Sequence, residues 1–201
     1  MSEMNRRDAL KVLGIAPLAA SIGVAPTHLE RVARRMEALE TAGATAAAPT
    51  FFTAHEWATV RLLVDYIIPR DARSGSATDA KVPEFIDFLM SDKEASPSSK
   101  TAMHGGLAWL DNECQHRFSK MFVTATDAQR RQVLDDIAWP KKAPPEMSHG
   151  VMFFSRFRDL TASGFFSSQM GWQDVQYKGN LALPAWNGCP PEALAKLGVS
   201  Y

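Results

Sequence analysis

The sequence has none of the short motifs by which the common soluble enzymes are recognised. It contains no G-x-G-x-x-G fingerprint, no P-loop, no G-x-S-x-G and no H-E-x-x-H. No two of its five histidines lie at the i, i+4 spacing that places two metal ligands on one helix face. We therefore predict no catalytic residue and no cofactor in this chain, although an autonomous enzyme of unknown type stays open as an alternative.

The chain also lacks an excess of charge of either sign. Its 22 Lys and Arg balance 22 Asp and Glu, so the formal net charge is +0 at pH 7 and no overall field attracts polyanions. We expect no nucleic-acid partner. Cysteine is scarce as well: Cys114 and Cys189 form no C-x-x-C pair, so no metal site is predicted, although the two could form a disulfide in an oxidising compartment.

The N-terminus, in contrast, carries a recognisable pattern. Two adjacent arginines, Arg6 and Arg7, precede Leu10, Lys11 and about fourteen uncharged residues, 12–25. This apolar run is shorter than the roughly 20 residues that cross a bilayer, but it has the length of a signal-peptide core. The pattern resembles a twin-arginine (Tat) export signal. A basic amphipathic helix at the N-terminus is the alternative.

The end of the leader is less clearly marked than its start. Residues 27–41 have the pattern of a charged helix, and the small-residue triplet Ala44-Thr45-Ala46 follows it. The leader could be cut near Ala46, cut earlier, or retained as an anchor. We divide the chain into residues 1–46, a leader with a charged helix or linker, and residues 49–201, the main domain.

From Pro49 onward the pattern is that of short helices separated by polar turns. Capping-box patterns at Thr53 and Thr126 each precede an amphipathic run, and Pro83 suits the first turn of another helix. Alternation typical of strands is scarce. We predict an all-α, single compact domain of about five or six helices, followed by an irregular C-terminal tail that is rich in aromatic residues and glycine.

Aromatic side chains are concentrated in this last part of the chain. They are interleaved with glycines, and large protein interfaces use aromatic side chains as anchors. The alternative, which the sequence supports equally, is that these side chains belong to the hydrophobic core. The candidate residues for a partner interface are Phe165, Phe166, Trp172, Tyr177 and Trp186.

Several blocks of the main domain resemble one known family. The resemblance extends from about Phe51 to the C-terminus, and the order and spacing of the blocks carry it. The blocks are DYIIPRD at 65–71, VPEFID at 82–87, RDLT at 158–161, GFFS at 164–167, YKGN at 177–180 and WNG at 186–188. In this order they resemble the gluconate 2-dehydrogenase subunit 3 family.

This resemblance implies a function. It implies a small, non-catalytic subunit of a periplasmic flavoprotein dehydrogenase of the glucose-methanol-choline class, with FAD in the large subunit and a cytochrome c subunit as a further partner. It also implies export by the Tat translocase and a periplasmic location, with membrane association through the partner or a retained leader. An exported helical scaffold subunit of a different membrane or periplasmic complex is the alternative.

The periplasm would also give the cysteines a role, because two accessible thiols normally oxidise there. One option is an internal bridge between Cys114 and Cys189. The other is a bond from Cys189 to the large subunit, with Cys114 left as a small buried side chain. We favour the internal bridge.

Overall fold

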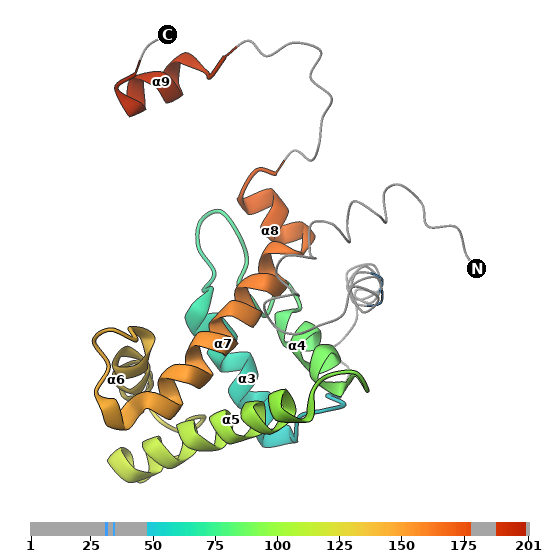
Figure 1. Cartoon of the computed structure of the whole chain (residues 1–201), viewed down its shortest axis with the longest axis vertical. Helices are drawn as coiled ribbons and strands as arrows, with labels where there is room; N and C mark the ends of the chain where they lie inside the picture. Colours follow the sequence, from blue (N-terminus) through green and yellow to red (C-terminus); the bar gives the residue numbers. More distant parts are fainter. Residues whose placement is uncertain (1–30, 32–33, 35–47, 178–187, 200–201) are drawn as a thin grey trace, which may run out of the picture.

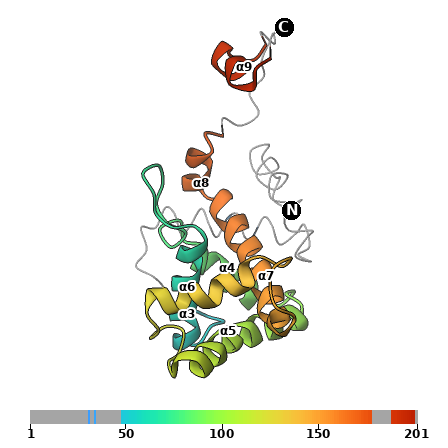
Figure 2. The ribbon, with the colours of Figure 1, turned by 90° about the vertical axis from the view of Figure 1, so that its left-hand side faces the viewer.

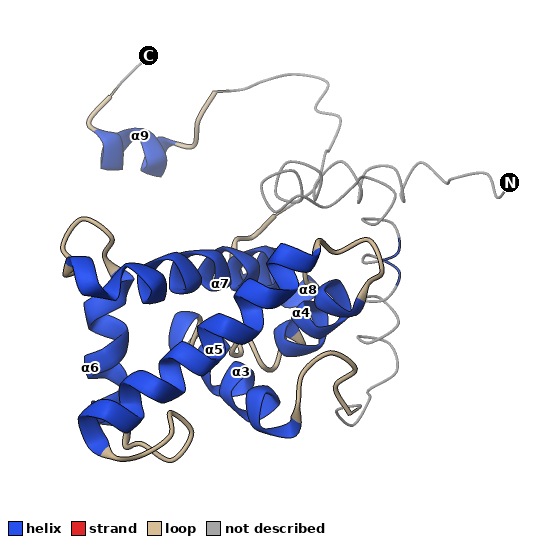
Figure 3. Cartoon of the chain, turned by 60° about the horizontal axis from the view of Figure 1, so that its bottom comes forward, coloured by secondary structure: helices blue, strands red, loops and turns tan. Residues whose placement is uncertain are grey.

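The computed structural model describes residues 31, 34, 48–177 and 188–199. In these residues it contains seven α-helices, one short 3₁₀-helix and no strand (Figure 3). None of the described helices is long and apolar enough to cross a membrane. The elements are α3 (Ala54–Ile67), α4 (Val82–Ser91), α5 (Pro97–Phe118), α6 (Asp127–Ala138), η1 (Pro145–Met147), α7 (Ser148–Phe166), α8 (Gln169–Asp174) and α9 (Pro191–Leu197).

The all-α prediction is confirmed, and local sequence explains where several helices begin. Thr53 and Thr126 each accept the N–H of the residue three positions later, while the side chains of Glu56 and Gln129 accept the N–H of the cap. Both predicted capping boxes therefore form, and each satisfies two backbone groups that would otherwise lack partners. Pro83 occupies the first turn of α4, as predicted.

Helix α7 lies at the centre of the domain and contacts α3, α4, α5 and α6 (Figure 1). Because it is surrounded by other helices, it contributes buried side chains along most of its length. The largest completely buried side chains of the core are Phe122, Phe157, Phe165, Leu63, Ile86, Leu107, Leu110 and Ile137.

Two charged side chains hold loops against the helices. The Asp87 carboxylate on α4 accepts the N–H groups of residues 50–52, at 2.8, 2.9 and 3.2 Å, just before α3 begins. The Arg130 guanidinium on α6 donates to three carbonyl oxygens in residues 122–125, which connect α5 to α6. Each side chain thus satisfies backbone groups that no helix pairs.

The C-terminal part differs in detail from the expected irregular tail. Two short helices, α8 and α9, form there, on either side of residues 178–187, which lie outside the described part of the chain. They account for a helix number above the predicted five or six. Of the charged helix predicted over 27–41, Arg31 and Arg34 are described, and both are helical.

Candidate functional site

The end of α7 and the short helix α8 project from the helical domain (Figures 1 and 2). Ser168 begins α8, and its side-chain oxygen accepts the N–H of Gly171. A Cβ at position 171 would lie 2.1 Å from the carbonyl oxygen of Phe165, so only glycine allows α8 to pack this closely on α7. The turn therefore fixes the direction in which α8 leaves the domain.

Large apolar side chains are exposed on this projection. Phe166 is 42% exposed, Trp172 36%, Val175 53% and Tyr177 56%. The rings of Trp172 and Tyr177 lie 6.1 Å apart, within the range of an aromatic pair. We call these four residues, Phe166, Trp172, Val175 and Tyr177, the tail patch.

The tail patch contains some of the residues predicted for a partner interface and leaves out others. Phe165 is 1% exposed and belongs to the core, so its side chain is not available at the surface, in contrast to the neighbouring Phe166. Trp186 lies outside the described residues. The structure therefore pairs the ring of Trp172 with that of Tyr177, and it pairs the exposed Phe166 with the buried Phe165, whose ring centroids lie 5.2 Å apart.

The loop between α3 and α4 lies beside α8 (Figure 1). Arg73 in this loop forms an ion pair with Asp174, at 3.3 Å, and also donates to its carbonyl oxygen. Asp71 accepts the N–H groups of Ser74 and Arg73, and these hydrogen bonds lower the pKa of its carboxyl group. The loop is thus internally ordered and supports α8 from one side.

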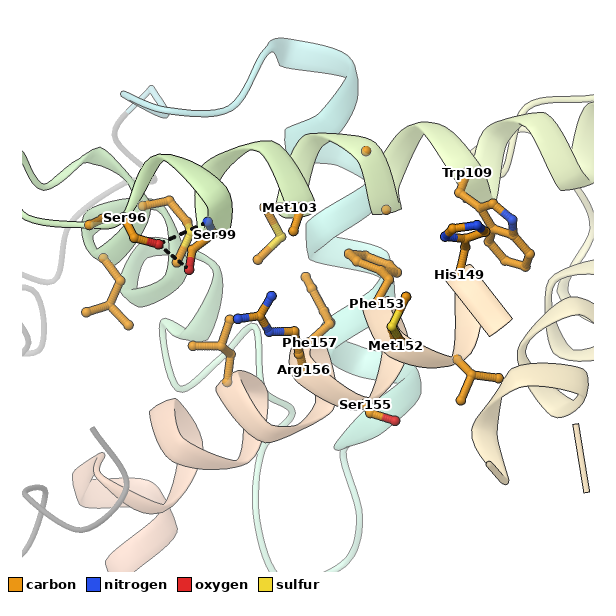
Figure 4. Close-up of a pocket in the computed structure, with 18 of the residues that line it drawn as sticks. Ser96, Ser99, Met103, Trp109, His149, Met152, Phe153, Ser155, Arg156 and Phe157 are labelled. Atoms are coloured by element: carbon orange, nitrogen blue, oxygen red, sulfur yellow. Dashed lines mark hydrogen bonds between the residues drawn. The ribbon is translucent and has the colours of Figure 1, made fainter. Parts of the chain in front are cut away.

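A second surface feature is a groove of about 800 Å³ between α5 and α7 (Figure 4). This volume is within the range of sites that bind small molecules. The groove ends at Ser96 and Ser99 on one side and at Trp109 and His149 on the other (Figure 4). Most of its lining is apolar, and it includes Leu89, Met90, Met103, Val151, Met152, Phe153, Phe157 and Leu160. We call it the α5–α7 groove.

Two glycines let α5 and α7 approach each other beside the groove. A Cβ at Gly106 of α5 would lie 1.9 Å from the Phe153 ring, and one at Gly150 of α7 would lie 2.4 Å from the Trp109 ring. Gly105, the neighbour of Gly106, has open space where a Cβ would be. The two helices are therefore in close contact near Gly106 and Gly150, and the groove lies where they diverge.

Two histidine–carboxylate pairs join α3 to α5. The first is His55 with Asp111 and the second is His104 with Glu56, each with 2.6 Å between nitrogen and oxygen. Asp111 also accepts the N–H of Phe122, and Glu56 also serves the capping box. Because both carboxylates have structural hydrogen bonds of this kind, we interpret the pairs as ties between helices. Among the described residues, no three His, Cys, Asp or Glu side chains are placed to hold a metal ion.

The sequence model of the gluconate 2-dehydrogenase subunit 3 family matches residues 54–183, well over half of the chain. The chain belongs to this family. No curated protein and no solved structure matches it. The family name describes one subunit of a dehydrogenase complex, so this subunit 3 chain has a role in such a complex. The match includes both the α5–α7 groove and the tail patch.

The subunit 3 chain holds Cys114 in the centre of its core. This side chain is 0% exposed and carries no disulfide in the structure. Burial, together with the negative charge of Asp111, raises the pKa of the Cys114 thiol to about 11. Cys189 is half-buried just before α9. The bridge between the two cysteines therefore stays a prediction.

One predicted site of this chain cannot be located in the structure, and one surface feature of the structure was not predicted. The residues predicted to form the export signal, Arg6, Arg7, Leu10 and Lys11, lie outside the described part of the chain. The α5–α7 groove was not predicted, because a groove is a shortfall of packing between helices that are distant in sequence. Paired glycines in the amphipathic run of residues 97–118 were the signal of a close helix contact that the sequence did offer.

Proposed function

We propose that this chain is the small, non-catalytic subunit of a periplasmic flavoprotein dehydrogenase of the glucose-methanol-choline class that oxidises a sugar or sugar acid. In this proposal FAD and the catalytic residues belong to the large subunit. Family membership supports it, because the family name describes one subunit of a dehydrogenase. The observation in the structure that carries it is the tail patch, an exposed aromatic surface on a projecting helix.

The tail patch has the chemistry of a protein interface. Tryptophan and tyrosine are enriched among the residues that contribute most to binding, since they bury a large apolar area at a low cost in side-chain entropy. Gly171 and the Arg73–Asp174 pair hold the patch in a fixed position, so little order has to be gained on binding. We therefore assign the tail patch as the contact with the FAD-bearing large subunit.

A pair of tryptophan substitutions tests this assignment. Trp172→Ala removes an anchor of the tail patch, and Trp139→Ala, at an exposed tryptophan after α6, is the matched control. We expect the first to weaken binding of the large subunit about tenfold or more, which corresponds to about 1.4 kcal/mol, and the second to leave it unchanged. Equal effects of the two substitutions would remove the tail patch from the proposal.

The identity of the partner is tested by isolating the native complex. A yellow flavoprotein that co-purifies with this chain supports the dehydrogenase role. A colourless partner would indicate a scaffold subunit of another complex, and substrate turnover by the purified chain alone would indicate an enzyme. Both of these results contradict the proposal.

The proposal includes folding and export of the large subunit. Insertion of FAD requires a folded protein, and the twin-arginine pathway transports folded cargo. The sequence pattern of Arg6, Arg7, Leu10 and Lys11 supports this part. Changing Arg6 and Arg7 to lysine should leave dehydrogenase activity in the cytoplasm. Activity that still reaches the periplasm would show that the large subunit is exported in another way.

A further inference from the structure

Two ion pairs place Arg31 next to one end of the α5–α7 groove. Arg31 lies 3.1 Å from the Glu94 carboxylate and 3.5 Å from that of Asp92. Both acids belong to the connection between α4 and α5, and the groove lining includes Ala95, next to Glu94, and Met90, two residues before Asp92. Exposed ion pairs contribute little to stability. We therefore use these contacts to locate Arg31 and not as a source of binding energy.

The apolar part of the leader is attached close to this point. Residues 12–25 are uncharged, and only five residues separate them from Arg31. We infer that this segment, Val12–Ala25, docks in the α5–α7 groove of its own chain. The inference rests on the proposed function in one respect: docking would keep the apolar segment out of water until the export machinery takes it up.

The dimensions of the segment and the groove agree. The groove follows α5 from Ser96 to Trp109, which is about 20 Å at roughly 1.5 Å per residue. Pro17 prevents an unbroken helix through the whole segment but suits the first turn of a helix over residues 17–25, about 13 Å long. Residues 12–16 are long enough to cover the rest. The five connecting residues can span up to about 17 Å.

The lining of the groove matches an apolar segment with one polar end. Met90, Met103 and Met152 can adapt to irregular apolar side chains, since methionine is flexible and polarisable. Arg156 reaches from α7 toward Met103 near the Ser99 end of the groove (Figure 4). Because Arg156 lines the groove, its guanidinium can donate to carbonyl groups at a helix C-terminus docked there.

This arrangement also sets the direction of the segment. The chain comes from Arg31 at the Ser96 end, so residue 25 lies near Arg156 and residue 12 near Trp109. The arginine pair, Arg6 and Arg7, then extends beyond the groove and stays accessible to an export receptor. Docking therefore covers the apolar part of the leader without covering its recognition residues.

The tether favours the leader over other occupants of the groove. A short flexible connection gives the attached segment an effective concentration of about millimolar. A helix of the large subunit or of a second copy would have to bind the groove more tightly than the leader at that concentration. The apolar segment of this chain is therefore the occupant to which we commit.

Disulfide trapping in the full-length chain tests the inference. Leu18 is changed to Cys together with Ala102→Cys, in a chain that also carries Cys189→Ser. Ala102 is exposed on α5 and lines the groove, whereas Ala108 is exposed on the same helix outside the groove and gives the matched control. We expect the Leu18–Ala102 pair to cross-link about tenfold faster or more than the Leu18–Ala108 pair under mild oxidation, measured by peptide mass spectrometry.

Charge substitutions supply a second, independent readout. Met152→Asp places a charge in the groove and should slow the Leu18–Ala102 cross-link severalfold, whereas Met121→Asp, at an exposed methionine outside the groove, should not. Full rates in the Met152→Asp chain would contradict docking.

Two results would overturn the inference. Equal cross-linking at Ala102 and Ala108 would mean that the leader only collides with the domain. A covalent dimer whose yield rises with protein concentration would assign the groove to a second copy. The cross-linking assay needs neither the large subunit nor the translocase. The cross-link can therefore form even if export does not depend on Arg6 and Arg7, so the two proposals can be refuted separately.

Discussion

The contact between α5 and α7 can be tested at two neighbouring glycines that should respond in opposite ways. Gly105 and Gly106 both lie inside α5, where replacing glycine by alanine normally stabilises a helix by about 1 kcal/mol. At Gly105 a Cβ meets nothing within 4 Å. At Gly106 it would lie 1.9 and 2.2 Å from the Cδ2 and Cγ atoms of Phe153. The helical preference is the same at both positions. The difference in stability between the two variants therefore measures the cost of packing a methyl group against Phe153.

The magnitude follows from the surroundings of Phe153. Its ring is 7% exposed and lies 5.5 Å from the ring of Phe157, so it has little room to move away from a new methyl group. Overpacking of this kind costs about 1 to 3 kcal/mol, and the short distance favours the upper end. After the gain in helical preference, we expect Gly106→Ala to lower the free energy of unfolding by about 2 kcal/mol.

Urea denaturation followed by circular dichroism measures both substitutions. We expect Gly105→Ala to raise the free energy of unfolding by up to about 1 kcal/mol and Gly106→Ala to lower it by about 2, a gap of about 3 kcal/mol between adjacent residues. In thermal unfolding the loss corresponds to roughly 4–8 °C. If Gly106→Ala were as stable as the parent, α5 and α7 could not approach as closely as the structure has them.

Two further predictions concern titratable groups. Burial opposes ionisation of Glu56, but hydrogen bonds from Thr53 and His104 outweigh this effect and lower the pKa of its carboxyl group. The ionised carboxylate therefore stabilises the fold above the pKa of the unfolded state, and this contribution is lost as pH falls through the pKa of the folded state. Glu56→Gln should therefore cost about 1 kcal/mol at pH 7 in chemical denaturation, with the gap to the parent closing below about pH 4; a constant gap would contradict this. The buried Cys114 thiol, with its pKa raised to about 11, should resist alkylation at pH 8 in a Cys189→Ser chain until denaturant is added, and rapid labelling of the native chain would refute its burial.

Helix starts could be predicted from the sequence because their causes are local. The capping boxes at Thr53 and Thr126 each depend on residues three positions apart. The role of Asp87 could not be predicted in this way. Its partners, the N–H groups of residues 50–52, lie at least 35 positions away in the chain. Only the packing of α3 against α4 brings them to this carboxylate.

The candidate interface shows the same limit within a single dipeptide. Phe165 and Phe166 are the same residue type and are adjacent in sequence. Phe165 is nevertheless 1% exposed and Phe166 42% exposed. Adjacent side chains on a helix point about 100° apart, so the two rings face different surroundings. Which one faces the core depends on α4, because Gly164 on α7 packs against Phe85 and Val82. The sequence could therefore predict an aromatic surface at this place but not its members.

The two apolar surfaces of the chain are built from different parts of α7. From α7 the α5–α7 groove uses residues 149, 151–153, 155–157 and 160, whereas the tail patch begins at Phe166 and continues through α8 to Tyr177. No residue belongs to both, so occupation of the groove by the leader does not remove a side chain from the proposed contact with the large subunit. The buried side chains of α7 fix this helix in the core, and both surfaces include residues of it. A partner bound at the tail patch and a leader docked in the groove can therefore be carried by the same chain at the same time, as the proposed export of an assembled complex requires.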